Sequence, residues 1–217
     1  MENHSGLKKL LKISNIYTIL MNILGAKEAA KWLNQNFYKV KPGDKITDIG
    51  CGPGSLLHSY KHLFPTDINY SGIDPNEHYI KSARNEFGEH ANFYDGTCET
   101  FINDSRFQKS DLILCNGVLH HLNDRQVKSL FDFLHRNLKS EGGRFLAMEP
   151  VHLIKETSLS RWVMNLDRGM HIRKEPDWKK MMNDSGLEYK TNIITALIRI
   201  PYNYILIEAT LGENSSI

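Results

Sequence analysis

The residues best suited to chemistry gather around one glycine-rich segment, KITDIGCGPGSLL, at residues 45–57. Apolar and β-branched residues lead into Gly50, Gly52 and Gly54, and a helical pattern begins at Ser55. This order predicts a strand, a tight turn and a helix. Glycine tolerates the positive φ angles of such a turn and lets the main chain approach a ligand closely. The G-x-G-x-G spacing differs from the dinucleotide pattern G-x-G-x-x-G, whose last glycine would fall at Ser55.

Carboxylates stand beside this turn and after the next strand. Asp48 comes shortly before the first glycine, and Asp74 ends the following strand-like run. A carboxylate at the end of a second strand can accept hydrogen bonds from both hydroxyls of a ribose. Asp74 could equally cap a helix that has Pro75 as its first residue, and both roles can hold together.

Imidazole and carboxylate side chains follow the later strand-like runs. His120 and His121 come after the fourth run, and Glu149 and His152 surround the end of the fifth. Neutral imidazole near pH 7 is suited to act as a general base. Adjacent residues of regular structure cannot both face one pocket, so either histidine could be the base, with substrate positioning or helix capping as the alternative. Glu149 could be a base, could orient one of the histidines, or could be an ordinary loop residue.

Strand and helix patterns alternate through the middle of the chain. Strands are expected at 45–49, 69–73, 91–95, 110–115 and 144–148, with helical patterns between them. Asn123 and Gln126 predict a capping box at the start of the helix that precedes the fifth strand. Such alternation favours a parallel sheet with helices on both faces and right-handed crossovers.

Two further strand-like runs, at 188–196 and 203–211, follow each other near the C-terminus. A parallel pair needs a crossover of about a dozen residues, and no helix fits between these two runs. They are therefore expected to be antiparallel neighbours. The predicted fold class is α/β, a doubly wound, seven-stranded, mostly parallel sheet that closes with an antiparallel C-terminal hairpin.

The N-terminal segment carries apolar residues at helical spacing. Asn15 and Asn22 interrupt its apolar run and no cleavage site follows, so we expect an amphipathic helix and neither a signal peptide nor a membrane span. Residues 1–40 would form a helical cap on a domain at 41–217, with a lid insertion at about 151–175. The helix could close a pocket, form a homodimer or contact a lipid-like substrate.

Composition narrows the classes of function. A formal net charge of +2 gives no strong electrostatic case for nucleic acid, which would favour a concentrated basic face. Cys51, Cys98 and Cys115 lack C-x-x-C spacing, so neither a disulfide framework nor a zinc site is indicated, and a cytoplasmic location fits best. No His, Asp or Glu constellation has the spacing of metal ligands, so no metal is expected.

Together, these motifs resemble the class I methyltransferases that use S-adenosylmethionine. The likeness covers about residues 40–211 and rests on the Asp-x-Gly-x-Gly-x-Gly turn, the acidic end of the second strand and the closing hairpin. The segment Val118-Leu119-His120-His121-Leu122 is similar to a signature of small-molecule methyltransferases, which modify metabolites or polyketide and saccharide intermediates. The resemblance implies S-adenosylmethionine as cofactor and a small-molecule methyl acceptor.

The resemblance also implies roles for the residues of the turn. Gly50, Gly52 and Gly54, with Cys51 held among them, would let the backbone lie against the methionine half of the cofactor. Asp48 would accept from its α-ammonium group, directly or through water.

Other residues would hold the rest of the cofactor, again as the resemblance implies. Asp74, followed by Pro75, would take the ribose. The family often has an acidic residue after the glycine that follows the third strand. Here Thr97 stands in that place, so backbone groups of Thr97 and Cys98 are expected at the adenine. Asn116 and Gly117 would border the methyl-bearing sulfur.

The acceptor side is expected to draw on three parts of the chain. Tyr17 would come from the N-terminal helix, His152 from the end of the fifth strand, and Arg168 and His171 from a lid at 167–173. The charges of that last segment could equally be ordinary solvated surface.

The expected function is methyl transfer to oxygen, nitrogen or carbon of a small molecule by in-line displacement. A methyltransferase that acts on RNA or protein is the alternative among enzymes. The glycine spacing and the hairpin disfavour a nicotinamide-dependent reductase. A non-catalytic, cofactor-binding regulatory subunit is the alternative from another class. We expect a small-molecule partner, no nucleic acid, no stable membrane insertion and possible homodimers.

Overall fold

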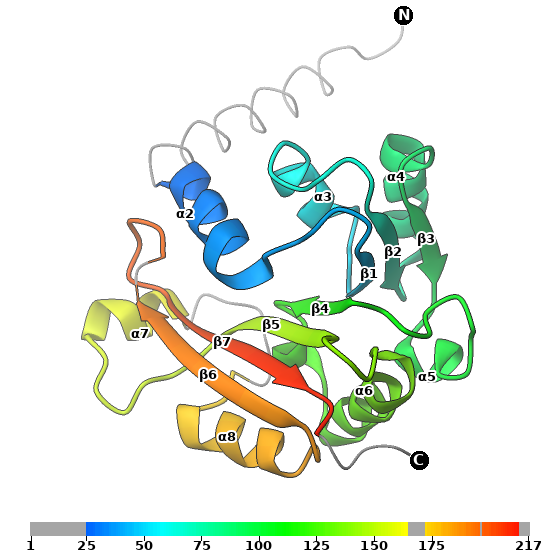
Figure 1. Ribbon diagram of the computed structural model, residues 1–217. Coiled ribbons are helices and arrows are strands. Elements are labelled where there is room, and N and C mark those ends of the chain that lie inside the picture. The colour runs from blue at the N-terminus through cyan, green and yellow to red at the C-terminus, as the bar shows by residue number, and fades with distance from the viewer. Residues whose placement is uncertain (1–24, 165–171, 196, 213–217) are drawn as a thin grey trace, which may run out of the picture.

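A seven-stranded sheet forms the middle layer of the computed structural model, which describes residues 25–164, 172–195 and 197–212 (Figure 1). The strands are β1 (Lys45–Ile49), β2 (Asn69–Asp74), β3 (Asn92–Asp95), β4 (Leu112–Asn116), β5 (Arg144–Pro150), β6 (Glu188–Thr195) and β7 (Asn203–Thr210). They lie in the order β3-β2-β1-β4-β5-β7-β6. The first five are parallel, and β7 is antiparallel to both β5 and β6. The predicted fold class, including the antiparallel hairpin, is confirmed.

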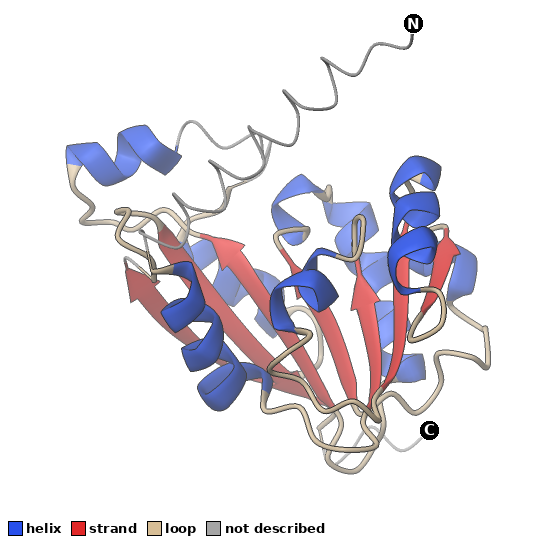
Figure 2. Ribbon diagram, turned by 90° about the horizontal axis from the view of Figure 1, so that it is seen from above, coloured by secondary structure: helices blue, strands red, loops and turns tan. Residues whose placement is uncertain are grey.

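Helices cover both faces of the sheet, as the view from above makes clear (Figure 2). The helical elements are α2 (Ala26–Leu33), η1 (Asn34–Tyr38), α3 (Ser55–Tyr60), α4 (Glu77–Phe87), α5 (Cys98–Phe101), η2 (Leu119–His121), α6 (Asp124–Asn137), α7 (Ser158–Met164) and α8 (Glu175–Asn183). One apolar core joins α2, η1, α3 and α4 to the sheet, and a second joins α5, α6 and α8 to its other face. Among the described residues, no helix combines the length and apolar character needed to cross a bilayer.

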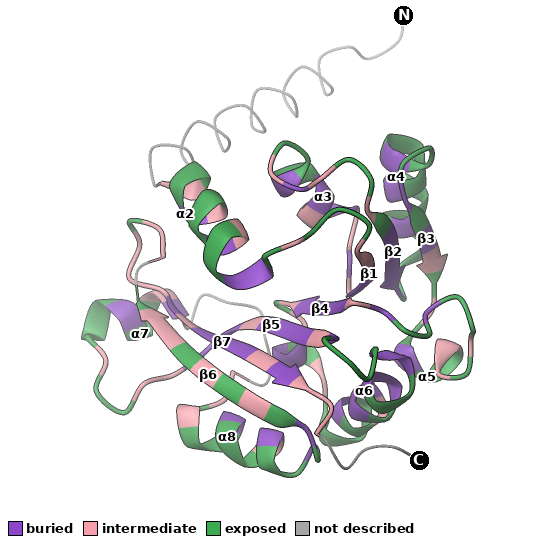
Figure 3. Cartoon of the chain, in the orientation of Figure 1, coloured by how far each residue is buried: buried purple, intermediate pink, exposed green. Residues whose placement is uncertain are grey.

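The burial of the strands follows from their place in the sheet. Every residue of β4 from Leu112 to Cys115 is buried, because helices cover this strand on both faces (Figure 3). The edge strand β6 instead alternates between exposed and half-buried residues. The continuous apolar run of β4 is thus a consequence of its central position.

The expected helical cap joins the main core over its described part. Leu33, Phe37 and Tyr38 are buried and belong to the core that contains Ile46 of β1. The Arg144 guanidinium of β5 donates a hydrogen bond to the carbonyl of Tyr38 at 2.7 Å. Residues 26–38 therefore pack as an integral part of this layer.

The start of α4 differs from the expectation. Asn76 caps the helix, and its side-chain oxygen accepts from the amides of His78 at 3.0 Å and Tyr79 at 3.3 Å. Pro75 precedes the cap, so its predicted place as the first helical residue is wrong, as is the capping role of Asp74. The reason is that the Asp74 carboxylate turns back toward the glycine turn and leaves the helix amides to Asn76.

The capping box of Asn123 and Gln126 at α6 is confirmed, with both bonds at 3.0 Å.

The strand order places a switch point between β1 and β4. From β1 the chain proceeds outward to β2 and β3, whereas β4 leads to β5 on the other side. The segments that leave the carboxyl ends of β1 and β4 therefore depart in opposite directions and leave a crevice between them, where open α/β sheets bind ligands.

The close packing around Gly72 can be tested by substitution. A methyl group added in Gly72→Ala would lie 2.7 Å from Cys51 Sγ and 2.8 Å from Phe93 Cδ1, both of which are buried. We expect a loss of about 1–3 kcal/mol in the free energy of unfolding, measured with urea. Gly212→Ala is the control, because its methyl group would meet only the end of the Glu188 side chain at 3.3 Å. Equal unfolding midpoints for the two variants would contradict this account.

Candidate active site

A cavity of about 600 Å³ opens at the carboxyl ends of β1, β2 and β4. Its wall includes these residues predicted from the sequence: Gly50, Gly52, Asp74, Pro75, Thr97, Cys98, Gly117 and His121. Other predicted site residues lie outside the lining: Asp48, Cys51, Gly54, Asn116, His120, Glu149 and His152. The cavity therefore brings together the glycine turn, the end of β2, the start of α5 and the loop that follows β4.

Glycines make one wall of this cavity. Gly50 and Gly117 have φ angles of 72° and 65°, a region that favours glycine. A Cβ at Gly50 would stand 2.3 Å from Cγ2 of Val118, so the turn and the loop after β4 approach too closely for any side chain there. Bare main chain is consequently offered to whatever fills the cavity.

Asp74 fixes the shape of the glycine turn while facing the cavity. Its Oδ2 accepts from the amide of Gly52 at 3.0 Å, and its Oδ1 accepts from the amide of Asn76 at 2.8 Å. A carboxylate has about four lone-pair positions, so these two bonds leave acceptor capacity on the cavity side. This geometry suits a ligand that carries hydroxyl groups.

Asp48 lies behind the turn. Its carboxyl group is buried and accepts a hydrogen bond from the Tyr70 hydroxyl of β2. Desolvation raises the pKa of Asp48 to about 7; the Tyr70 hydrogen bond opposes this shift and the charge of Asp74 adds to it. Its predicted contact with an α-ammonium group stays a prediction.

The far end of the cavity is formed by α5 and α6. The Thr97 hydroxyl caps α5 by accepting from the amide of Thr100 at 3.4 Å. Burial raises the pKa of the Cys98 thiol to about 12, which removes it as a nucleophile near neutral pH. Sequence reasoning missed Gln126 and Ser129, whose spacing on one helix face was the available signal.

Asn116, at the end of β4, carries an unsatisfied amide. Both Nδ2 and Oδ1 are buried and have no hydrogen-bond partner among the residues that the structure describes. Buried polar groups are nearly always bonded, so an orphaned amide requires an explanation. Asn116 is followed directly by Gly117, which lines the cavity.

The two histidines of the short helix η2 have different surroundings. His120 is buried, with its Nδ1 2.6 Å from Oε2 of Glu149, whereas His121 lies on the cavity wall. The two rings remain neighbours, with centroids 4.0 Å apart. The structure therefore assigns different surroundings to two residues that the sequence presents as equivalent.

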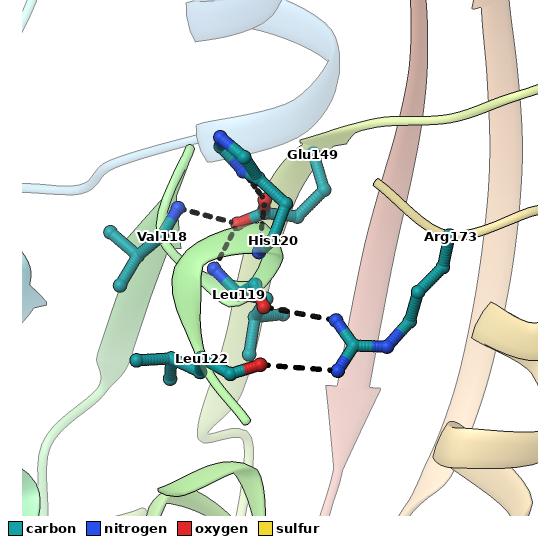
Figure 4. A network of polar contacts seen from close by, with 6 residues as sticks. All are labelled: Val118, Leu119, His120, Leu122, Glu149 and Arg173. Atoms are coloured by element: carbon teal, nitrogen blue, oxygen red, sulfur yellow. Dashed lines mark hydrogen bonds and ion pairs between the residues drawn. The ribbon is translucent and has the colours of Figure 1, made fainter. Parts of the chain in front are cut away.

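Glu149 organises the loop after β4 (Figure 4). The carboxylate is completely buried within β5, and its Oε1 accepts from the amides of Val118 and Leu119, both at 2.9 Å. Its Oε2 accepts from the amide of His120 at 3.3 Å in addition to the ring contact. These contacts match the predicted role of Glu149 as a group that orients a histidine. The alternative that Glu149 is an ordinary loop residue is wrong, because the residue is buried in β5.

His152 faces a different hollow. It borders a second cavity of about 460 Å³, together with Glu156, Arg161 and Lys174. Its Nδ1 lies 3.2 Å from Oε1 of Glu156, whose side chain is only 4% exposed. The other predicted acceptor residues, Tyr17, Arg168 and His171, lie outside the described residues.

Metal ligands do not cluster in the described part of the chain. Among those residues, no group of three or more His, Cys, Asp or Glu side chains could hold a metal ion.

Comparison with known proteins agrees with the fold and the cavity. The model of a family described as "Methyltransferase domain" matches residues 47–145, which run from β1 to β5. Carboxy-S-adenosyl-L-methionine synthase of Campylobacter fetus is 30% identical over 114 residues, covering 51% of this chain and 46% of that protein. Ribosomal RNA large subunit methyltransferase G of Shewanella pealeana is 28% identical over 171 residues, covering 72% of this chain and 39% of that protein. The chain thus spans less than half the length of these relatives.

A solved structure shares the fold. Human N-acetylserotonin methyltransferase, in a complex with S-adenosylmethionine, superposes with a TM-score of 0.61 at 21% identity, covering 85% of this chain and 51% of that one. Fold, switch-point cavity and glycine turn are the features that the resemblance to class I methyltransferases implies. The match of residues 47–145 to the methyltransferase model agrees with the resemblance to the S-adenosylmethionine-dependent methyltransferases.

The raised pKa of Asp48 predicts a pH-dependent stability. Unfolded Asp48 ionises near pH 4, but the folded protein retains the proton up to about pH 7. The folded state therefore loses stability as the pH rises from about 4 to 7. Asp48→Asn should remove this loss, so its stabilising effect on the free energy of unfolding should be larger at pH 8 than at pH 5 by about 2 kcal/mol.

Denaturant unfolding of the ligand-free protein at both pH values measures this difference. Asp67→Asn, at an exposed carboxylate, serves as the matched control and should show no such change. If wild type and Asp48→Asn differ by the same amount at both pH values, the account of Asp48 fails.

Proposed function

We propose that this chain transfers the methyl group of S-adenosylmethionine to oxygen, nitrogen or carbon of a small-molecule acceptor. The observation that carries the proposal is the switch-point cavity, which has Gly50 and Gly117 on its walls, Asp74 at one end and His121 beside the loop after β4. Bare main chain beside a carboxylate at this place in the sheet suits a cofactor that carries a ribose.

The residues around the cavity fit the cofactor. Main chain at Gly50 and Gly52 would lie against its methionine half, and Asp74 would accept from the ribose hydroxyls. Thr97 and Cys98, with Gln126 and Ser129 nearby, would surround the adenine. The orphaned amide of Asn116 would find partners in the polar amino-acid end. When bound, the cofactor supplies an activated methyl group on a sulfonium that is a good leaving group.

The protein's own contribution is to align the reactants and to move a proton. His121 would take a proton from a hydroxyl or ammonium group of the acceptor, because neutral imidazole is basic enough near pH 7. His120 and Glu149 would act through position, since both are buried away from the cavity and hold the loop that carries His121. Holding both reactants in line supplies much of the remaining rate.

RNA is the second candidate acceptor. The likeness to a ribosomal RNA methyltransferase, over 72% of this chain, supports it, whereas the formal charge of +2 gives it no electrostatic support. The likeness to N-acetylserotonin methyltransferase supports the small-molecule acceptor. A regulatory subunit would bind the cofactor without turnover.

One experiment separates these candidates. The protein is incubated with S-adenosylmethionine labelled in the methyl group, in parallel with a metabolite extract and with total RNA, and the labelled product is identified by mass spectrometry. Label in a small molecule supports the proposal. Label in RNA alone would replace it with the second candidate, and cofactor binding without labelled product in either would favour the regulatory subunit.

Loss of the Asp74 charge should weaken cofactor binding. Asp74→Asn removes charge-assisted acceptors for the ribose hydroxyls, so the Kd for S-adenosylmethionine should rise about 10–100-fold. Calorimetric titration measures it. Asp95→Asn is the control, because Asp95 pairs with Asp74 at the adjacent strand end but lies outside the cavity lining. An unchanged Kd in Asp74→Asn would remove this residue from the site.

Replacement of His121 should change the pH profile of turnover. In the wild type, kcat should fall toward acidic pH, because protonated imidazole cannot accept a proton. His121→Gln should lower kcat about 100-fold and abolish this limb. His120→Gln should retain the limb, since His120 is held by Glu149. Persistence of the limb in His121→Gln would exclude His121 as the base.

A further inference from the structure

The loop at residues 118–122 is held at its two ends by different partners (Figure 4). At its start, amide groups of Val118 and Leu119 donate to the buried Glu149 carboxylate. Within the loop, the amide of Leu122 donates to the carbonyl of Leu119 at 3.2 Å. The amide of His120 donates to Glu149 as well, and the amide of His121 donates to the carbonyl of Val118 at 2.9 Å, so each amide of the loop has a partner.

Arg173, from a distant part of the sequence, donates to carbonyl groups of the loop. Its Nη1 donates to the carbonyl of Leu119 at 3.0 Å, and its Nη2 donates to the carbonyl of Leu122 at 3.2 Å. The guanidinium lies 5.2 Å above the ring of the fully buried Trp178, and its side chain is only 14% exposed. It is therefore neither a residue lining the main cavity nor solvated surface, the two roles weighed for its segment.

The backbone of Arg173 is tied to the end of β5. Its carbonyl accepts from the amide of His152 at 3.1 Å, and Lys174 forms a bridge with His152. His152 follows Glu149 closely along the chain. Arg173 thus connects the segment after β5 to the far end of the same loop whose near end Glu149 holds.

We propose that Arg173 is a positioning residue: its forked guanidinium fixes the carbonyls of Leu119 and Leu122, and thereby holds His121 at the cavity wall. The inference rests on the proposed function, because it gives His121 a place beside the reacting groups. Glu149 and Arg173 then act as a pair, an acceptor for amides at one end of the loop and a donor for carbonyls at the other.

The geometry requires arginine. Two carbonyls separated along the loop receive two parallel N–H groups from one rigid plane, which a single ammonium cannot reproduce. The planar group also stacks on Trp178, a contact that favours arginine. Lysine should therefore restore only part of the function.

The test begins with hydrogen exchange in the ligand-free protein, which needs neither cofactor nor acceptor. In Arg173→Gln, the amides of His121 and Leu122 should exchange about tenfold faster or more, while those of β4 keep their rates. Arg173→Lys should give an intermediate increase. Arg125→Gln is the matched control, because Arg125 lies just after the loop with a side chain that is 87% exposed, and its rates should match the wild type.

Kinetics with labelled S-adenosylmethionine form the second part. In Arg173→Gln, kcat should fall about tenfold or more with the acidic limb of the pH profile retained, because His121 is present but poorly held. Loop exchange that is unchanged in Arg173→Gln would overturn the proposal. Faster exchange throughout the chain in both Arg173 variants would also overturn it, since the residue would then serve general stability. Faster exchange confined to the loop in Arg173→Gln, together with no methyl transfer by the wild type, would support the positioning role. That result would count against the proposed function alone.

Discussion

The buried carboxylate of Glu149 is the interaction on which the candidate site depends. A charge with no exposure to water is tolerated only when hydrogen bonds surround it, and here three loop amides and one imidazole supply them. The carboxylate lies on β5 and the donors lie on the loop after β4, so the pair locks two neighbouring strand ends together. Breaking it would leave both an unpaired charge and several unpaired amides.

The other side of the switch point relies on the absence of side chains. Gly50 lies so close to Val118 that the glycine turn and the Glu149-bound loop define each other's position. Asp74 holds the turn from β2 through the amide of Gly52. The cavity is therefore enclosed by two segments that are each fixed by a carboxylate from a neighbouring strand, and its shape is set before any ligand enters.

Local patterns in the sequence predict most of this fold. The glycine turn, Asp74 and the antiparallel hairpin are recognisable because spacing within a few residues determines them. Glu149 and Arg173 bind loop residues that lie 29 to 54 positions away in the sequence. A single sequence does not indicate which residues come into contact at such separations. The choice between His120 and His121 was equally hidden, since only the 3₁₀ geometry of η2 turns one toward Glu149 and the other toward the cavity. The predicted cap of α4 is wrong because the Asp74 carboxylate accepts hydrogen bonds from the amides of Gly52 and Asn76 instead.

A crystal structure of the chain grown with S-adenosylhomocysteine tests the central claim most directly. The account predicts the nucleoside in the cavity between Gly50 and Gly117, with its ribose hydroxyls on Asp74 and its amino-acid end within reach of the Asn116 amide. The loop at 118–122 should keep its bonds to Glu149. A ligand bound elsewhere, or a saturating concentration that leaves this cavity without the nucleoside, would contradict the account.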